Sequence, residues 1–276
     1  MTRSMPVGPT PPRLVATDLD GTLVRSDGSI SGRTVEAVER LEAAGADFVM
    51  VTGRPPRWMA VVADQIGHHG LAVCANGALL YDLRTERVVQ AHLLEAEAAL
   101  DVVEALRRDI PGIAFAVEKG PLDGVPGSFA REPVYVPRYD NGEVAVEEVQ
   151  QMLAGGAVKL LARSEAHGSD ELLAAARTAL GSTAAEVTHS SNGGLLEISA
   201  AGISKASGLA ALAAQRGVLA DEVIAFGDMP NDLPMLAWAG RSVGMANAHP
   251  DVLAEADEVT ASNDEDGVAK VLERWF

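Results

Sequence analysis

The stretch Leu14-Val15-Ala16-Thr17-Asp18-Leu19-Asp20-Gly21-Thr22 decides the fold. Its apolar first half has no polar alternation, which is typical of a short strand buried on both faces. The second half turns abruptly polar, with Asp18 and Asp20 separated by a single residue. In an open parallel sheet, ligands bind beyond the carboxyl ends of the strands. The stretch therefore predicts a strand whose end carries functional carboxylates.

Similar apolar runs follow along the chain and alternate with helical patterns. The runs predict strands at residues 48–51, 71–74, 195–198, 223–226, 241–245 and 257–260. Apolar residues at helical spacing predict helices at residues 31–44, 56–66, 204–216 and 264–275. Strands that alternate with helices build a parallel sheet covered on both faces. We therefore expect an α/β fold with a Rossmann-like parallel sheet core.

The pattern of predicted elements changes in the middle of the chain. A hairpin is predicted at residues 79–94, followed by a mixture of helices and strands with one irregular stretch. The helices are predicted at 95–108, 143–153 and 169–180, the strands at 113–117, 157–162 and 186–190, and the irregular stretch at 120–138. We interpret residues 82–190 as an inserted α+β cap domain, and residues 13–81 and 191–276 as the core. The proline-rich residues 1–12 predict a disordered leader and not a secretion signal.

Composition excludes several classes of protein. The 276 residues include 39 acidic and 22 basic ones, a net charge of −17, which disfavours nucleic acid as a partner in the absence of a basic patch. The lone Cys74 excludes an intrachain disulfide framework and fits a reducing compartment. No run of eighteen uncharged apolar residues exists to span a bilayer. We expect a cytoplasmic protein with neither nucleic acid nor membrane as a partner.

Three predicted strands end in polar residues suited to catalysis. Asp18, Thr52 and Asp228 each follow an apolar run, and a parallel sheet would gather them around one pocket. With Asp20 nearby, the carboxylates would repel one another, and this repulsion would raise the pKa of one of them. A hard divalent cation relieves this repulsion, and Mg²⁺ prefers such oxygen ligands. The pattern therefore predicts a Mg²⁺ site.

Lys205 is one of only four lysines, and it stands at the start of a predicted helix. A cation there opposes the helix macrodipole, which favours negative charge at this end. We therefore expect an anion opposite Lys205, either a carboxylate nucleophile or a phosphate.

Four segments in this order resemble the motifs of haloacid-dehalogenase-like phosphatases. They are Asp18-Leu19-Asp20-Gly21-Thr22, Thr52-Gly53-Arg54, Lys205 and Gly227-Asp228-Met229-Pro230-Asn231-Asp232. The long insert, Asn76-Gly77-Ala78 and residues 263–268 are similar to the Cof-type branch, so the resemblance covers residues 14–276.

The resemblance implies a role for each matching residue. Asp18 would be the nucleophile that forms an aspartyl-phosphate, and Asp20 the general acid and base. Thr52 and Lys205 would stabilise charge on the phosphoryl group as catalytic residues, while Gly53 and Asn231 would bind the substrate. The implied Mg²⁺ ligands are Asp18, Asp20 (through its backbone carbonyl), Asp228 and Asp232.

The resemblance thus predicts a Mg²⁺-dependent phosphatase of small phosphorylated metabolites, acting as a monomer or small homo-oligomer. Two alternatives stay open: a sugar phosphomutase of the same architecture, and a catalytically silent metabolite-binding protein. Asn231 and Asp232 could also simply cap a helix. Arg54 could bind an anion or pair with an acidic neighbour. The sequence does not rank the cap residues Lys159, Arg163 and His189 as pocket residues.

Overall fold

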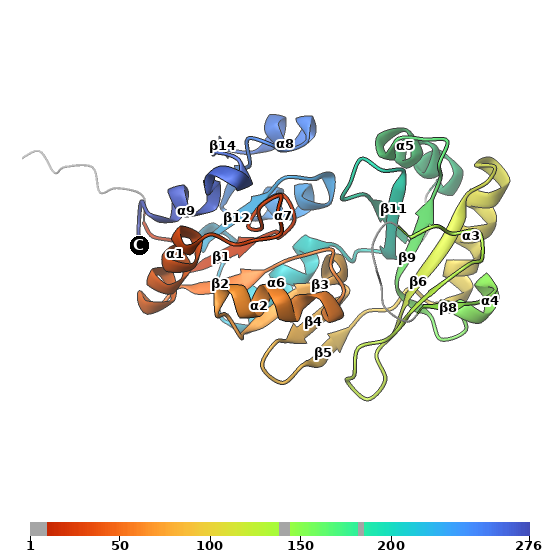
Figure 1. Ribbon diagram of the computed structural model, residues 1–276, viewed down its shortest axis with the longest axis horizontal. Helices are drawn as coiled ribbons and strands as arrows, with labels where there is room; N and C mark the ends of the chain where they lie inside the picture. Colours follow the sequence, from red (N-terminus) through yellow and green to blue (C-terminus); the bar gives the residue numbers. More distant parts are fainter. Residues whose placement is uncertain (1–9, 138–143, 182–184) are drawn as a thin grey trace, which may run out of the picture.

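The computed structural model of the protein describes residues 10–137, 144–181 and 185–276. Figure 1 shows two lobes side by side, joined by chain segments that cross between them. We call residues 10–91 and 205–276 the core lobe, and the described residues between 96 and 200 the cap lobe. Most of the expected leader, residues 1–9, lies outside the described residues.

The core lobe is built on a parallel sheet of five strands in the order β14-β13-β12-β1-β2. These strands are β14 (Glu258–Val259), β13 (Arg241–Gly244), β12 (Val223–Gly227), β1 (Leu14–Thr17) and β2 (Asp47–Met50). Leu14 lies opposite Val223 on one side and Asp47 on the other. All four residues of β1 are buried, as expected for a central strand without polar alternation. The predicted α/β class and parallel core are confirmed.

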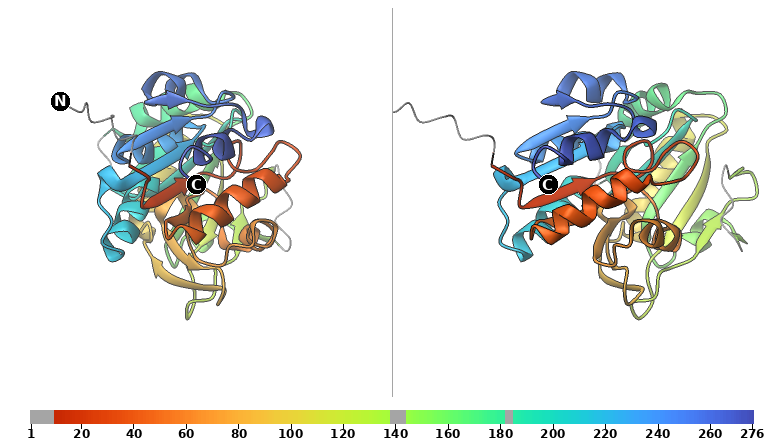
Figure 2. Two further views of the ribbon diagram at one scale, coloured as in Figure 1. Left: turned by 90° about the vertical axis from the view of Figure 1, so that its left-hand side faces the viewer. Right: turned by 60° about the vertical axis from the view of Figure 1, so that its left-hand side comes forward.

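Helices cover this sheet, and one of them, at Pro250–Glu255, stands where no helix was predicted. They are α1 (Gly32–Ala43), α2 (Met59–Ile66), α6 (Lys205–Gln215), α7 (Leu233–Trp238), α8 (Pro250–Glu255) and α9 (Gly267–Leu272). The hydroxyl of Ser31 accepts a hydrogen bond from the N–H of Thr34 and caps α1. α1 packs against α9, and both views of Figure 2 show them side by side. The helix expected at 264–275 is shorter, because Asp266, at φ 60°, separates a 3₁₀ turn from α9.

A second, antiparallel sheet extends the core lobe. It consists of β3 (Leu71–Cys74), β4 (Leu79–Asp82) and β5 (Arg87–Ala91), in that order. A parallel bridge between Val51 and Val73 continues the main sheet into β3. The predicted hairpin is confirmed as β4 and β5.

The cap lobe is a six-stranded sheet with helices on one face. Its strands are β10 (Ala185–Thr188), β11 (Leu195–Ala200), β9 (Ala157–Arg163), β6 (Ala114–Lys119), β7 (Phe129–Arg131) and β8 (Ala145–Val146). Its helices are α3 (Ala96–Asp109), α4 (Val149–Met152) and α5 (Ser169–Leu180), and their apolar residues share one buried cluster with Leu160 and Ala162 of β9. The alternate residues of that strand, Lys159, Leu161 and Arg163, line a cavity toward the core lobe. Figure 1 shows α3 on the side of the sheet away from the core.

The strand pairing differs from the sequence expectation at both ends of the insert. β11 was expected in the core, yet it pairs antiparallel with β9 and β10 of the cap. A short apolar run does not reveal which sheet it joins. At the other end, β5 pairs with β4 in the core lobe. The expected helix at 143–153 is wrong in its first half, because β8 precedes a short α4, and β7 interrupts the stretch expected to be irregular.

No helix among the described residues is both long and apolar enough to cross a membrane.

Candidate active site

The carboxyl ends of β1 and β12 bring three carboxylates together. One oxygen each from Asp18, Asp228 and Asp232 lies within 4.8 Å of the other two, and all three residues are buried. β1 ends at Thr17 and β12 at Gly227, so two of the aspartates follow directly on neighbouring parallel strands. The structure therefore assembles an acidic cluster that could hold a metal ion at the predicted sheet edge.

Lys205 supplies the positive charge for this cluster. Its Nζ lies 2.7 Å from Oδ1 of Asp18 and 2.6 Å from Oδ1 of Asp232, and its side chain is completely buried. The preceding Ser204 forms a capping box with Ser207, which starts α6 at the lysine. The anion expected opposite the helix start is thus a pair of carboxylates.

Asp232 also shapes the loop after β12. Its Oδ2 accepts hydrogen bonds from the backbone N–H groups of Asp228 (3.0 Å) and Met229 (2.9 Å). Because Oδ1 contacts Lys205, both oxygens of Asp232 have partners inside the protein. Asp228 has a partner of its own, the hydroxyl of Thr22, which donates to Oδ1 at 2.9 Å. Asp232 therefore acts on this site at least by holding the backbone that carries Asp228.

Burial and mutual repulsion disturb the protonation of the cluster. Burial and the negative charges of Asp232 and Asp228 raise the pKa of Asp18 well above its usual value, although Lys205 opposes the shift. Burial, again with Asp232, raises the pKa of Asp228 to about 7, against the hydrogen bond from Thr22. Burial alone would lower the pKa of Lys205, but Asp18 and Asp232 outweigh it and raise the value. These carboxyl groups resist ionisation because their negative charges would repel one another at close range. A hard divalent cation removes that repulsion and prefers oxygen ligands of this kind.

Asp20 stands apart from the three clustered carboxylates. Its side chain is 61% exposed and forms a bidentate ion pair with Arg54, at 2.5 and 2.8 Å. Both residues line the same cavity as Asp18. Of the two alternatives for Arg54, the structure shows pairing with an acidic neighbour. That neighbour is Asp20, the expected general acid.

The second predicted strand end carries Thr52 and Gly53. Thr52 is buried, and its hydroxyl accepts a hydrogen bond from the N–H of Arg54 at 3.0 Å. The carbonyl of Gly53 accepts a hydrogen bond from Nζ of Lys159 at 2.7 Å. Gly53 lines the cavity together with Asn231, whose Nδ2 donates to Oδ1 of Asn76 at 3.1 Å. The predicted substrate-binding residues thus reach the same space as Asp18.

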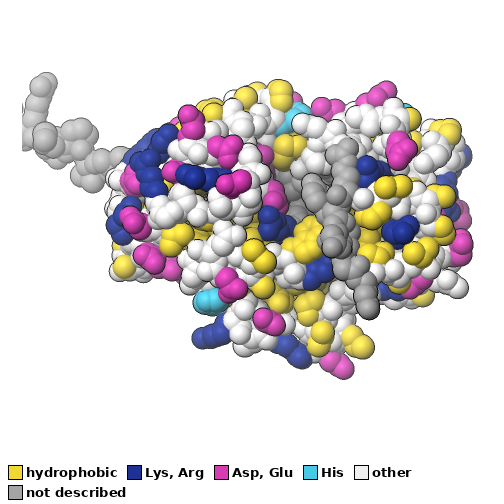
Figure 3. Space-filling view, viewed as in Figure 1, with side chains coloured by type: hydrophobic (Ala, Val, Ile, Leu, Met, Phe, Trp, Pro, Cys, Tyr) yellow, Lys and Arg dark blue, Asp and Glu magenta, His cyan; other side chains and the backbone are white. Residues whose placement is uncertain are grey.

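The cavity lies between the two lobes and has a volume of about 500 Å³. Its core side includes the polar residues described above. Its cap side combines charged and aromatic or apolar side chains: Glu118, Phe129, Tyr135, Lys159, Leu161, Arg163, Leu195 and Glu197. Figure 3 shows the surface hollowed between the lobes, with basic and hydrophobic side chains around the hollow. A cavity of this volume is within the range of sites for small molecules.

Comparison with known proteins identifies the family of this chain. The family model described as haloacid dehalogenase-like hydrolase matches residues 15–272. The chain belongs to the haloacid dehalogenase-like hydrolases.

Several relatives of this hydrolase are phosphatases. The 5-amino-6-(5-phospho-D-ribitylamino)uracil phosphatase YitU of Bacillus subtilis (strain 168) is 31% identical, over 97% of this chain and 98% of its own length. The pyridoxal phosphate phosphatase YbhA of Escherichia coli (strain K12) is 28% identical, over 94% and 97%. The solved structure of BT1666 from Bacteroides thetaiotaomicron, a phosphatase of the same superfamily, matches with a TM-score of 0.80 at 22% identity, over 99% and 98%. The predicted family, fold and phosphatase activity are confirmed.

Sequence reasoning missed several residues that contact the site of this hydrolase. Asn76 was noted only as part of the resemblance, and Thr22 and Glu197 were given no role. The positive φ values of Asn76 (56°) and Gly77 (96°) mark a tight turn, which Asn and Gly tolerate best. The Asn-Gly pair was therefore a readable signal of special backbone, whereas nothing in the sequence signalled the contact of Asn76 with the cap.

Of the three cap residues left unranked, Lys159 and Arg163 line the cavity, but His189 does not.

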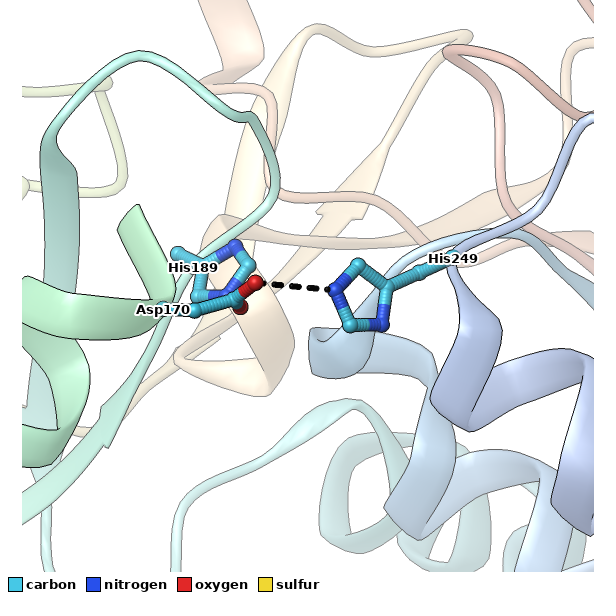
Figure 4. A group of neighbouring side chains, drawn as sticks. All are labelled: Asp170, His189 and His249. Carbon is cyan, nitrogen blue, oxygen red and sulfur yellow. Dashed lines mark hydrogen bonds and ion pairs between the residues drawn. The ribbon is translucent and has the colours of Figure 1, made fainter. Parts of the chain in front are cut away.

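His189 is completely buried, and its Nε2 lies 2.8 Å from Oδ1 of Asp170. Nε2 of His249, at the start of α8 in the core lobe, lies 3.3 Å from the other oxygen of Asp170 (Figure 4). Nδ1 of His249 accepts a hydrogen bond from the N–H of Asp251, so in the neutral ring Nε2 carries the proton and donates to Asp170. This cluster therefore joins cap to core by hydrogen bonds, and its tautomer disfavours a metal at Nε2 of His249.

Proposed function

We propose that this hydrolase is a Mg²⁺-dependent phosphatase that acts on small phosphorylated metabolites through a phosphorylated Asp18. The observation that carries the proposal is the buried contact of 2.7 Å between Asp18 and Lys205, beside two further carboxylates and on the wall of the cavity. A carboxylate held in this way is a recognised nucleophile for phosphoryl groups.

The metal ion would be held by the carboxylates of Asp18 and Asp228 and by the backbone carbonyl of Asp20. Asp232 would support it by fixing the backbone of Asp228 and the ammonium of Lys205. When bound, Mg²⁺ supplies positive charge that offsets the negative charge of the phosphoryl oxygens.

The chain's own residues would carry the two chemical steps. In the first, the Asp18 carboxylate attacks phosphorus, the bond from phosphorus to the leaving oxygen breaks, and Asp20 gives that oxygen a proton. In the second, Asp20 takes a proton from water, the water oxygen attacks phosphorus, and the bond to Asp18 breaks to release inorganic phosphate. Lys205 and the hydroxyl of Thr52 would stabilise charge on the phosphoryl oxygens. Asp20 must turn from Arg54 to do so, since the two form an ion pair.

The substrate class follows from the size and lining of the cavity. Its volume of about 500 Å³ is within the range of small-molecule sites, and its cap side carries aromatic, apolar and charged groups. Two relatives are named for phosphatase activity on a phosphoribitylaminouracil and on pyridoxal phosphate. We extend only their shared class, small phosphorylated metabolites, to this chain.

The test is a panel of phosphorylated metabolites assayed for phosphate release with Mg²⁺ and with EDTA. We expect release from several members with Mg²⁺ and none with EDTA. Isomerisation that depends on a bisphosphate activator would identify a phosphomutase instead. Tight binding of one phosphate ester without any turnover would identify a silent binding protein.

We also propose that the protein acts in the cytoplasm, as a monomer or small homo-oligomer. Its single cysteine, Cys74, cannot form an intrachain disulfide, which fits a reducing compartment. Cell fractionation and the mass in solution test the two statements.

A further inference from the structure

A buried ion pair in the cap lobe lies next to the active site. Nζ of Lys159, on β9, lies 2.6 Å from Oε1 of Glu197, on β11, and both side chains are about nine-tenths buried or more. Burial alone would raise the pKa of Glu197, but Lys159 and several hydrogen bonds outweigh it and lower the value, so this carboxylate is ionised. Burying two charges is costly unless further partners satisfy them. The location of those partners is therefore informative.

Both charged groups find their second partner in the core lobe. Lys159 donates to the carbonyl of Gly53 at 2.7 Å, and Oε2 of Glu197 accepts from Nδ2 of Asn76 at 3.0 Å. Gly53 follows Thr52 at the end of the second core strand, and Asn76 follows β3. The ion pair thus bridges the cap to two loops of the catalytic edge.

The bridge fixes the orientation of an active-site amide. An ionised carboxylate only accepts, so Asn76 must turn its Nδ2 toward Glu197 and its Oδ1 toward Asn231. Asn231 then presents Nδ2 to Asn76 at 3.1 Å, and this contact uses one of two N–H groups. Its own Oδ1 is buried without a hydrogen-bond partner among the described residues. Because that orientation leaves an acceptor unsatisfied, it must be imposed by the chain of contacts that starts at Glu197.

We propose that Glu197 and Lys159 are positioning residues for phosphate binding, which the cap contributes to the core. Glu197 acts through Asn76 to aim an N–H of Asn231 at the phosphoryl group, and Lys159 holds the loop of Thr52 and Gly53 in place. Seating of the cap therefore completes the phosphate site as well as enclosing the rest of the substrate. The inference rests on the proposed phosphatase function.

The primary test compares Glu197→Gln with a matched cap variant, Glu132→Gln. Glu132 is equally buried, pairs with Arg107 and accepts from the N–H of Phe115, all within the cap lobe. Each variant is assayed for kcat and KM with p-nitrophenyl phosphate, for inhibition by inorganic phosphate, and for thermal midpoint. Inorganic phosphate probes the phosphate site alone, because it has no leaving group for the cap to contact.

We expect Glu197→Gln to weaken inhibition by inorganic phosphate and to lower kcat/KM, each by about tenfold. Glu132→Gln should lower the thermal midpoint to a similar extent and leave both constants within about twofold. Equal effects of the two variants would mean a purely structural role and overturn the proposal. So would an unchanged inhibition constant with a loss confined to bulky substrates, because Glu197 would then contact the leaving group itself.

A second variant covers the case in which Glu197→Gln does not fold. Lys159→Met combined with Glu197→Gln removes both charges, so no unpaired buried charge remains. Methionine cannot donate to Gly53, and the glutamine oxygen is a weaker acceptor than a carboxylate, so weaker phosphate inhibition is still expected. A folded double variant with the inhibition constant of the wild type would overturn the proposal. Wild-type protein that hydrolyses no phosphate ester, by contrast, would refute the proposed function first.

Discussion

Nζ of Lys205 lies 2.6 Å from Oδ1 of Asp232, and neither side chain is exposed to solvent. The same carboxylate holds two backbone N–H groups of the loop that carries Asp228. One buried ion pair therefore couples the start of α6 to the end of β12. Breaking such a pair leaves a buried charge without its partner, which is far costlier than losing a surface contact.

Lys205→Met should consequently destabilise the protein by about 3–5 kcal/mol and abolish turnover. The free energy of unfolding is measured by urea denaturation. Lys270→Met is the control, because Lys270 is exposed on α9 and its removal should cost less than about 1 kcal/mol. A loss of stability no larger than that of the control would contradict the role assigned to this buried cation.

Asp18→Asn should abolish turnover while the fold stays intact. The pKa of Asp18 is raised mainly by burial and by neighbouring carboxylates, so a neutral side chain relieves repulsion at this position. Asp232 still pairs with Lys205 in the variant. We expect kcat to fall by roughly three orders of magnitude or more, with an unchanged circular dichroism spectrum. Substantial remaining activity would refute Asp18 as the nucleophile.

Asp20→Asn should slow turnover most for substrates with poor leaving groups. A general acid contributes about 10²–10⁴-fold when the leaving oxygen needs a proton, and much less when it does not. The measurement is kcat for an alkyl phosphate and for p-nitrophenyl phosphate, in the wild type and the variant. If leaving-group departure limits the rate, equal losses for both substrates would remove Asp20 from the acid role.

The strand ends were predictable because their signal is local. Asp18, Thr52 and Asp228 each interrupt an apolar run, and parallel topology places such ends together. Lys205 was also found, since its position at a helix start is unfavourable without an anion. These predictions needed only residue type, hydrophobic pattern and the general rules of an α/β sheet.

The cap contacts were not predictable because they depend on how two lobes meet. Glu197 stands in a short apolar run that was assigned to the wrong sheet, so its approach to Asn76 was hidden. Pairing of Arg54 with an acidic neighbour was one of two open alternatives, and only the fold identified Asp20 as that neighbour. The engagement of both oxygens of Asp232 likewise follows from loop geometry that no pattern records.

Mg²⁺ should stabilise the protein more in alkaline than in acid solution. The pKa of Asp228 is about 7 in the metal-free fold, above its ordinary value of 3.8, so between these values the folded protein binds a proton that the unfolded chain releases. Raising the pH through this window therefore lowers the stability of the metal-free protein. A cation that binds the ionised carboxylates replaces the proton and restores stability.

Thermal midpoints with and without Mg²⁺ at about pH 5.5 and about pH 8.5 test this expectation. The increase on adding Mg²⁺ should be larger at the higher pH. Asp228→Asn provides the control, because it cannot ionise and should show a small increase at both values. An equal Mg²⁺ effect in wild type and variant would exclude Asp228 as a ligand.

The contact between cap and core at Asp170 can be separated from helix capping at His249. Nδ1 of His249 caps α8 through the N–H of Asp251, while Nε2 reaches Asp170 on the cap. In His249→Asn the new side chain still caps α8, but it is too short to reach Asp170 in the cap lobe. In His249→Ala both contacts are lost. We expect His249→Ala to be less stable than His249→Asn by about 1 kcal/mol, the usual value of a cap. We expect both variants to increase proteolysis at the cap–core boundary equally, because of the two contacts of His249 only the one to Asp170 crosses that boundary. If His249→Asn protected the boundary as well as the wild type, the contact with Asp170 would not hold the cap to the core.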